Sequence, residues 1–185
     1  MPSDEWALIL RPRAVYRHIR PVAAAYIPAY ILWFSLVIAV AIGSSATARL
    51  HIGLVASLAF MWAFVPVIHV AAALALIATA PRRAQPVGPA VALLLMGHGP
   101  WSLALLTIGA LGAAGLGHWF ELTSAIVAIA VVLTVRIVYA YCVEVLAASA
   151  VGAGLRAAAH QALTYAIAVL CVDWAVGGLA QRFGP

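Results

Sequence analysis

Residues 22–43 read VAAAYIPAYILWFSLVIAVAIG and contain no charged side chain. Because an α-helix rises about 1.5 Å per residue, about 20 apolar residues suffice to cross the hydrocarbon of a bilayer, which is roughly 30 Å thick. This stretch alone therefore predicts a membrane-spanning helix. The whole chain of 185 residues has the same character, with 66% hydrophobic residues, 8% charged residues and a mean hydropathy of +1.11. The composition predicts an all-α, polytopic integral membrane protein with little chain left for a soluble domain.

Further apolar runs follow the first, and prolines lie inside several of them. The second run covers 29 residues, too many for one upright span and too few for two, so we expect one tilted or kinked helix. Pro28, Pro66 and Pro100 predict kinks or local loosening in the first three spans. The sequence thus predicts a five-helix transmembrane bundle over residues 21–185, with spans at 22–43, 52–80, 89–116, 120–149 and 157–178.

The basic residues predict the orientation, since loops on the cytoplasmic side of a membrane carry an excess of them. The chain has no lysine, and seven of its arginines precede the first span or lie between spans two and three or four and five. Two others, Arg49 and Arg182, fall on the opposite side. This pattern predicts a cytoplasmic N-terminus and, with five spans, a periplasmic C-terminus. The absence of lysine and asparagine is typical of a GC-rich genome and favours a bacterial inner membrane.

Residues 1–20 form a predicted cytoplasmic segment that mixes apolar and basic side chains. Trp6 and Ile9 are apolar positions in this segment, and Pro12 should break a helix at its own position. The pattern predicts an amphipathic helix in the membrane interface, near anionic headgroups. Its membrane-surface arginines are Arg11, Arg13, Arg17 and Arg20. In the alternative interpretation these arginines only set the topology. Nucleic-acid binding is disfavoured, because the positive charge is spread along loop edges.

Several features together resemble the bacterial branch of the Yip1 family of integral membrane proteins. The N-terminal segment is led by a tryptophan and contains Arg11-Pro12-Arg13, and five spans with an inward N-terminus follow it. His69 stands in span two before a short basic loop, where such proteins often place a histidine. The segment Gly97-His98-Gly99-Pro100 stands where the family tends to have an aromatic residue and then a proline. The chain departs from the glycine pair often seen in the loop after span two, where it has Pro81-Arg82-Arg83.

This resemblance implies little about activity. Eukaryotic members of the family act in membrane trafficking with small GTPases, whereas bacterial members are mostly of undefined function. The resemblance brings no catalytic residues, and the sequence has no Walker loop, nucleophile elbow or zinc-protease helix. We therefore expect no enzyme, no metal site and no cofactor. The expected function is that of a non-catalytic accessory or scaffold subunit, in contact with membrane lipids and with a protein partner or a second copy.

His69 and His98 are candidate binding residues within the predicted spans. Each lies about ten residues from the span end nearest the Arg82-Arg83 loop, so both sit roughly 15 Å deep. Two opposed neutral imidazoles could ligate a haem b axially, with Gly97 and Gly99 allowing close approach of the macrocycle. This would make the protein an electron-transfer subunit. Alternatively, each histidine hydrogen-bonds a carbonyl freed by a proline, or a polar group on a neighbouring helix.

Arg136 lies well inside the fourth predicted span, where a charge is costly and needs a partner. Glu144 lies eight residues further on, roughly 12 Å along the axis, so we expect no direct bridge within the helix. Tyr139 is only one turn away. In one interpretation Arg136 binds an anionic headgroup or lines a polar internal site, which favours a small transporter or a lipid-handling protein. In the other, which we favour, it is a buried tether between helices. Glu144 is expected near the cytoplasmic interface, satisfied by ordinary solvation.

Overall fold

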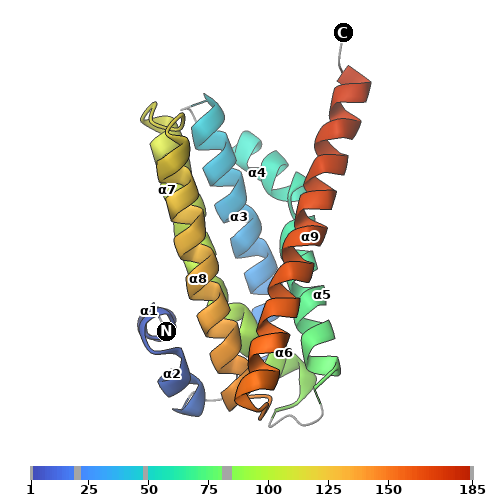
Figure 1. Ribbon diagram of the computed structural model, residues 1–185. Helices are drawn as coiled ribbons and strands as arrows, with labels where there is room; N and C mark the ends of the chain where they lie inside the picture. Colours follow the sequence, from blue (N-terminus) through green and yellow to red (C-terminus); the bar gives the residue numbers. More distant parts are fainter. Residues whose placement is uncertain (1, 19–21, 48–49, 81–84, 184–185) are drawn as a thin grey trace.

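The computed structural model describes residues 2–18, 22–47, 50–80 and 85–183, and all of their regular structure is helical. Side chains are described for residues 6–18, 22–46, 50–80, 85–167, 169 and 170. The elements are α1 (Pro2–Leu10), α2 (Pro12–His18), α3 (Tyr26–Thr47), α4 (Ile52–Met61), α5 (Phe64–Ala78), α6 (Val87–Leu95), the 3₁₀ turn η1 (Met96–His98), α7 (Gly99–Ala113), α8 (Phe120–Glu144) and α9 (Ala150–Phe183). Figure 1 shows α3, α7, α8 and α9 running along the length of one bundle.

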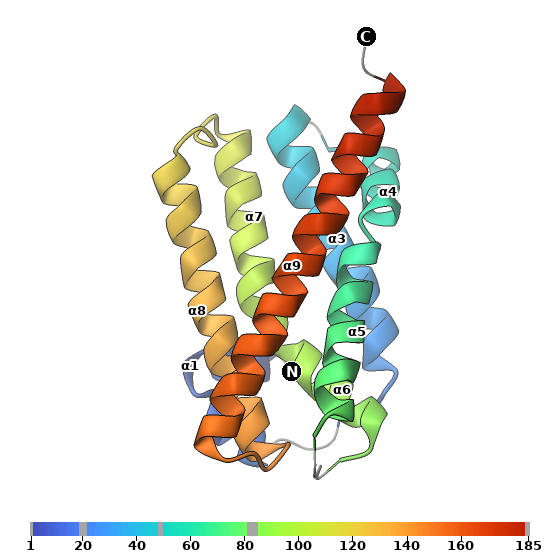
Figure 2. The same cartoon turned by 45° about the vertical axis from the view of Figure 1, so that its right-hand side comes forward.

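Within the described residues, four segments are long and apolar enough to cross a membrane: Tyr26–Ala46, Ile52–Ala78, Val87–Ala113 and Phe120–Glu144. The all-helical architecture predicted from the sequence is thus confirmed, and these four segments support the predicted integral membrane protein. The fifth predicted span falls within α9, which is 34 residues long. Figure 2 shows α9 crossing the whole bundle from the end where α8 stops. The count of five spans stays a prediction.

We call the end of the bundle where α8 stops and α9 starts the basal end; α1 and α2 lie beside it (Figure 1). Several arginines on which the predicted orientation depends lie outside the described residues or side chains: Arg20, Arg49, Arg82, Arg83 and Arg182. The arginines with described side chains are Arg11, Arg13, Arg17, Arg136 and Arg156. Arg156, in the first turns of α9, donates two hydrogen bonds to Thr79 at the end of α5: Nη2 to the carbonyl oxygen at 2.7 Å and Nη1 to Oγ1 at 3.1 Å. This pairing satisfies a helix end that faces the basal side.

Two of the three prolines interrupt their helices as predicted. Pro66 has no N–H to bond the carbonyl of Trp62, and the helix is interrupted at this point, between α4 and α5. Pro100 likewise has no N–H for the carbonyl of Met96, and the 3₁₀ turn η1 precedes it. Pro28 lies in the first turn of α3, where N–H groups have no intrahelical partner anyway, so the kink predicted there is not needed.

Small residues allow α3 and α7 to approach closely. A Cβ atom added at Gly109 would lie 2.7 Å from Cα of Ala41, and one added at Gly112 would lie 2.8 Å from Cβ of Ser45. These distances leave no room for a side chain, so the two glycines allow the backbones to approach. Gly109 and Gly112 therefore serve helix packing.

The N-terminal segment forms two short helices that pack on the bundle. α1 ends at Leu10 and α2 begins at Pro12, so the break expected at the proline is present. Leu8 is fully buried and Tyr16 is 5% exposed, whereas Trp6 and Leu10 are exposed. The Oη of Tyr16 lies 3.4 Å from the carbonyl oxygen of Leu93 in α6. One face of the segment is thus part of the protein core, a packing that the sequence did not predict.

Candidate functional site

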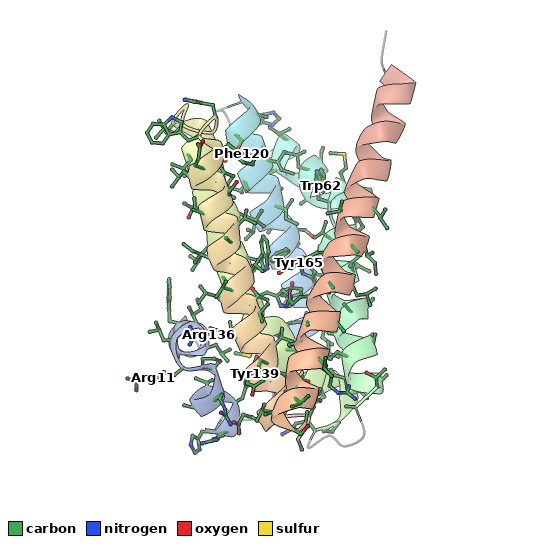
Figure 3. The ribbon with its side chains drawn as sticks, viewed as in Figure 1. Arg11, Trp62, Phe120, Arg136, Tyr139 and Tyr165 are labelled. Atoms are coloured by element: carbon green, nitrogen blue, oxygen red, sulfur yellow. The ribbon has the colours of Figure 1, made fainter. Side chains whose placement is uncertain are left out.

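Two polar regions could carry function, and the first is a groove at the basal end. It has a volume of about 520 Å³ and lies between the α1–α2 junction, α8 and the start of α9. Figure 3 shows Arg11, Arg136 and Tyr139 at this end, where α1 and α2 lie beside α8. We call this region the arginine groove; it is lined by Arg11, Arg13, Arg136 and Tyr139 among apolar residues such as Leu10 and Val135.

Glu144 holds the rim of the arginine groove together. Its carboxylate accepts a hydrogen bond from Nε of Arg13 at 2.8 Å and another from Nε of Arg17 at 2.9 Å. The bond to Glu144 raises the pKa of the Arg17 guanidinium. Bulk solvation was the expected environment of Glu144. Its side chain is instead only 11% exposed and ties α2 to the end of α8.

Arg136 is exposed rather than buried, and the tether predicted between helices is wrong. Its guanidinium forms no hydrogen bond or ion pair with any group in the described part of the chain, and the same holds for the exposed Arg11. The nearest carboxylate of α8, Glu144, is engaged by Arg13 and Arg17. Packing of α1–α2 against α8 therefore brings two cations to one groove, and neither has a partner among the described side chains.

The second polar region is the histidine pair, His69 of α5 and His98 of η1. Their ring centroids lie 4.7 Å apart with an interplanar angle of 27°, so the two rings are stacked. The Oη of Tyr30 in α3 lies 2.7 Å from Nδ1 of His69. Phe34 packs edge-on against His69 at 5.2 Å. The two histidines thus contact each other, an arrangement that the sequence analysis left open.

The stacked geometry does not fit a haem. Axial imidazoles must direct their nitrogens at one iron from opposite faces of the macrocycle. Rings stacked at 4.7 Å leave no space for a macrocycle between them. The space beside Gly97, expected to let a flat ring approach, is occupied by protein side chains instead. A Cβ added at Gly97 would lie 2.5 Å from Cγ2 of Ile137 and 3.2 Å from Oη of Tyr16. Among the described residues no group of three histidine, cysteine or acidic side chains could hold a metal ion.

No protein-family model matches this chain, and no curated protein or solved structure matches it either. The resemblance to the Yip1 family therefore stays a hypothesis based on the sequence motifs.

Sequence analysis did not identify several residues that contribute to these two polar regions. Tyr30 stands in an apolar run with no pattern to single it out, although it supplies the partner of His69. His160 of α9 is 6% exposed and lies within electrostatic range of both His69 and His98. The pairing of Glu144 with Arg13 and Arg17 joins residues more than 120 positions apart, so no local spacing could reveal it.

Proposed function

We propose that this chain is a non-catalytic integral membrane protein whose arginine groove binds the phosphate headgroup of an anionic lipid. The observation that carries the proposal is the presence of two exposed arginines, Arg11 and Arg136, in one largely apolar groove, neither of them paired with any side chain that the structure describes. A lipid-handling role is therefore preferred to transport. In this proposal, the lipid-bound protein itself acts as an accessory or scaffold subunit.

The chemistry of the lining matches an anionic lipid. Guanidinium groups bind phosphate oxygens through two parallel hydrogen bonds, and charge-assisted bonds of this kind are stronger than neutral ones. Leu10 and Val135 supply apolar walls beside the arginines, which suits the first carbons of an acyl chain. A charged side chain near lipid usually pairs with another charge or reaches the headgroup layer. Since Glu144, the carboxylate of α8 nearest in sequence, is already engaged by two other arginines, a lipid phosphate is the partner that we propose for Arg136.

The N-terminal helices support the proposal that the arginine groove lies at the level of the lipid headgroups. Trp6 is 56% exposed and Leu10 is 70% exposed, so α1 presents an aromatic and an aliphatic side chain outward. Such side chains favour the membrane interface, where the arginines of α1–α2 would meet anionic headgroups. Arg136 lies beside this segment in Figure 3 and can extend its guanidinium toward the same layer.

Orientation and cellular location belong to the same proposal. The excess of arginine on the basal side favours a cytoplasmic basal end and N-terminus, with α9 as a fifth span and a periplasmic C-terminus. A bacterial inner membrane, rich in anionic lipid, would supply the ligand. A Yip1-like scaffold of this kind would act through a protein partner or a second copy.

A titration with dye-labelled phosphatidylglycerol in detergent tests the proposal. We expect saturable binding that Arg136→Gln and Arg11→Gln each weaken by about tenfold, because each removes a charge-assisted contact to phosphate. Arg17→Gln is the matched control, since Arg17 pairs with Glu144 and does not line the groove. Raised salt should weaken binding as well. Equal affinity for labelled phosphatidylcholine, or an unchanged affinity in both groove variants, would contradict the proposal.

A further inference from the structure

The arginine groove is built from two parts of the chain that are far apart in sequence. Residues 10–14, where α1 meets α2, form one wall. Arg136 and Tyr139 of α8, together with the start of α9, form the other wall. We call α1 and α2 together the N-terminal lid, which lies beside the lower part of α8 in Figure 1. The groove therefore exists only while the lid is docked on α8.

Apolar contacts account for part of this docking. Leu8 of the lid is fully buried. The ring of Tyr16 lies edge-on to that of Tyr141 in α8, with centroids 5.5 Å apart at an interplanar angle of 76°. Burial of such side chains favours the docked state, since it removes apolar surface from water.

The polar contacts of the lid are weaker. Glu144 of α8 pairs with Arg13 and Arg17, whose side chains are 53% and 57% exposed. Ion pairs with exposed arginines contribute little, because water competes for the same charges. α2 has only seven residues, and an isolated helix of that length is not stable in water. Undocking of the lid should therefore unfold α2 as well.

Arg13 belongs both to the polar contacts of the lid and to the arginine groove. Its Nε donates to Glu144, and its side chain also lines the groove. A guanidinium has five N–H groups, so four remain on its Nη atoms, and these form no bond within the described part of the chain. A phosphate in the groove can accept from them while the pair with Glu144 stays intact. The ligand then adds to the contacts that hold the lid.

We propose that an anionic lipid in the arginine groove regulates the lid: its phosphate bridges Arg11 of the lid and Arg136 of α8, and so holds the lid docked. This inference rests on the proposed function and adds a conformational response to it. A ligand that binds only the docked state shifts the equilibrium toward that state by a factor of 1 + [L]/Kd. The anionic lipid content of the membrane thereby sets the fraction of molecules with a docked lid.

Undocking would change the surface of the bundle at the basal end. Tyr16 would leave the carbonyl oxygen of Leu93, which lies 3.4 Å from its Oη, and the ring of Tyr141. Tyr141 is fully buried while the lid is docked. Anionic lipid therefore controls access to this face of α6 and α8.

Hydrogen–deuterium exchange of α2 tests the inference on the full chain in detergent. The Kd for phosphatidylglycerol is measured first, by the titration with labelled lipid. The probes are the amides of residues 15–17; that of Val15 bonds the carbonyl oxygen of Arg11 at 3.1 Å. At a lipid concentration of about ten times the Kd, we expect their exchange to slow by about tenfold. Amides in the middle of α5, residues 70–76, should be unaffected and serve as the internal control.

Arg136→Gln is the matched control for charge. It leaves every arginine of the lid in place and alters only the wall on α8. With the affinity lowered about tenfold, the same lipid concentration should slow exchange of α2 only about twofold. Equal slowing in parent and variant would overturn the inference, because it would mean that anionic lipid attracts the lid without bridging it to α8.

A lid variant tests the coupling in the other direction. Leu8→Ser combined with Tyr16→Ser removes two buried contacts of the lid, and neither residue lines the groove. If the lid is mostly undocked, affinity for phosphatidylglycerol should fall about tenfold, as expected for Arg11→Gln. Ile77→Ala is the matched control, since Ile77 is equally buried but belongs to α5 and lies outside the groove. It should leave the affinity unchanged.

The outcomes separate this inference from the proposed function. Saturable binding of phosphatidylglycerol with unchanged exchange of α2 would overturn the coupling and leave the lipid site in place. Undiminished affinity in the lid variant would do the same, since α8 and α9 alone would then hold the lipid. Absence of saturable binding in the parent would remove the lipid site and the coupling together.

Discussion

The arginine groove and the histidine pair satisfy their polar groups in opposite ways. In the groove, Arg11 and Arg136 are exposed and unpaired within the described part of the chain, and they lie beside the end of a span. In the pair, neutral side chains are buried among α3, α5 and η1, and His69 receives its partner from within the protein. The cost of burying a charge explains the difference: neutral imidazoles can be enclosed with one hydrogen bond, whereas guanidinium groups remain where headgroups or water can reach them.

The largest expected effect comes from disturbing the contact between η1 and α8, which supports both the histidine pair and the arginine groove. Gly97 precedes His98, and Ile137 of α8, one position after Arg136, packs against it. Gly97→Val should destabilise the protein by about 3 kcal/mol, because the added carbons would displace Ile137 and Tyr16. Unfolding in detergent, followed by circular dichroism, measures the change.

Gly99→Ala is the control for this substitution. A Cβ at Gly99 meets only Cδ1 of Ile9, at the ordinary contact distance of 3.8 Å. We expect a change below about 1 kcal/mol there. Equal stability of the Gly97 and Gly99 variants would show that α8 does not rely on the close approach at Gly97.

An intermediate effect is expected inside the histidine pair. Tyr30→Phe removes the hydroxyl that bonds His69 and leaves a buried nitrogen unsatisfied, which should cost about 2 kcal/mol. Tyr165→Phe supplies the contrast, since its hydroxyl is buried without a partner in the described chain. This second variant should be neutral or slightly more stable. The same thermal unfolding experiment compares the two, and a Tyr30 variant as stable as the parent would mean that the bond to His69 contributes nothing.

The smallest effect on global stability is expected at the rim of the arginine groove. Glu144→Gln weakens the pairing with Arg13 and Arg17, but ion pairs with exposed arginines contribute little to unfolding free energy. The change should appear locally, as α2 detaches from α8 more often. We expect cleavage by trypsin after Arg13 or Arg17 to become a few-fold faster while the melting temperature barely shifts. Unchanged cleavage would indicate that the packing of Leu8 and Tyr16 alone holds the segment.

Sequence reasoning reached the spans because their signal is local. Each of the four apolar segments carries its hydropathy within about 25 residues, and Pro66 and Pro100 act on carbonyl groups four positions earlier. Arg136 shows where such reasoning fails. Its place in an apolar run predicted burial, but exposure depends on which face of α8 the neighbouring helices cover.

The sequence by itself determined that this protein is helical and apolar enough to cross a membrane, that Pro66 and Pro100 interrupt their helices, and which few polar side chains lie within the spans. Only the tertiary structure decided how those side chains are grouped. In the tertiary structure His69 stacks on His98, with Tyr30 beside them. The packing of α1–α2 against α8 pairs Glu144 with Arg13 and Arg17, whereas Arg136 has no partner among the described residues. Hydropathy and proline effects are properties of neighbouring residues, whereas these groupings depend on how helices far apart in the chain are rotated and packed against one another.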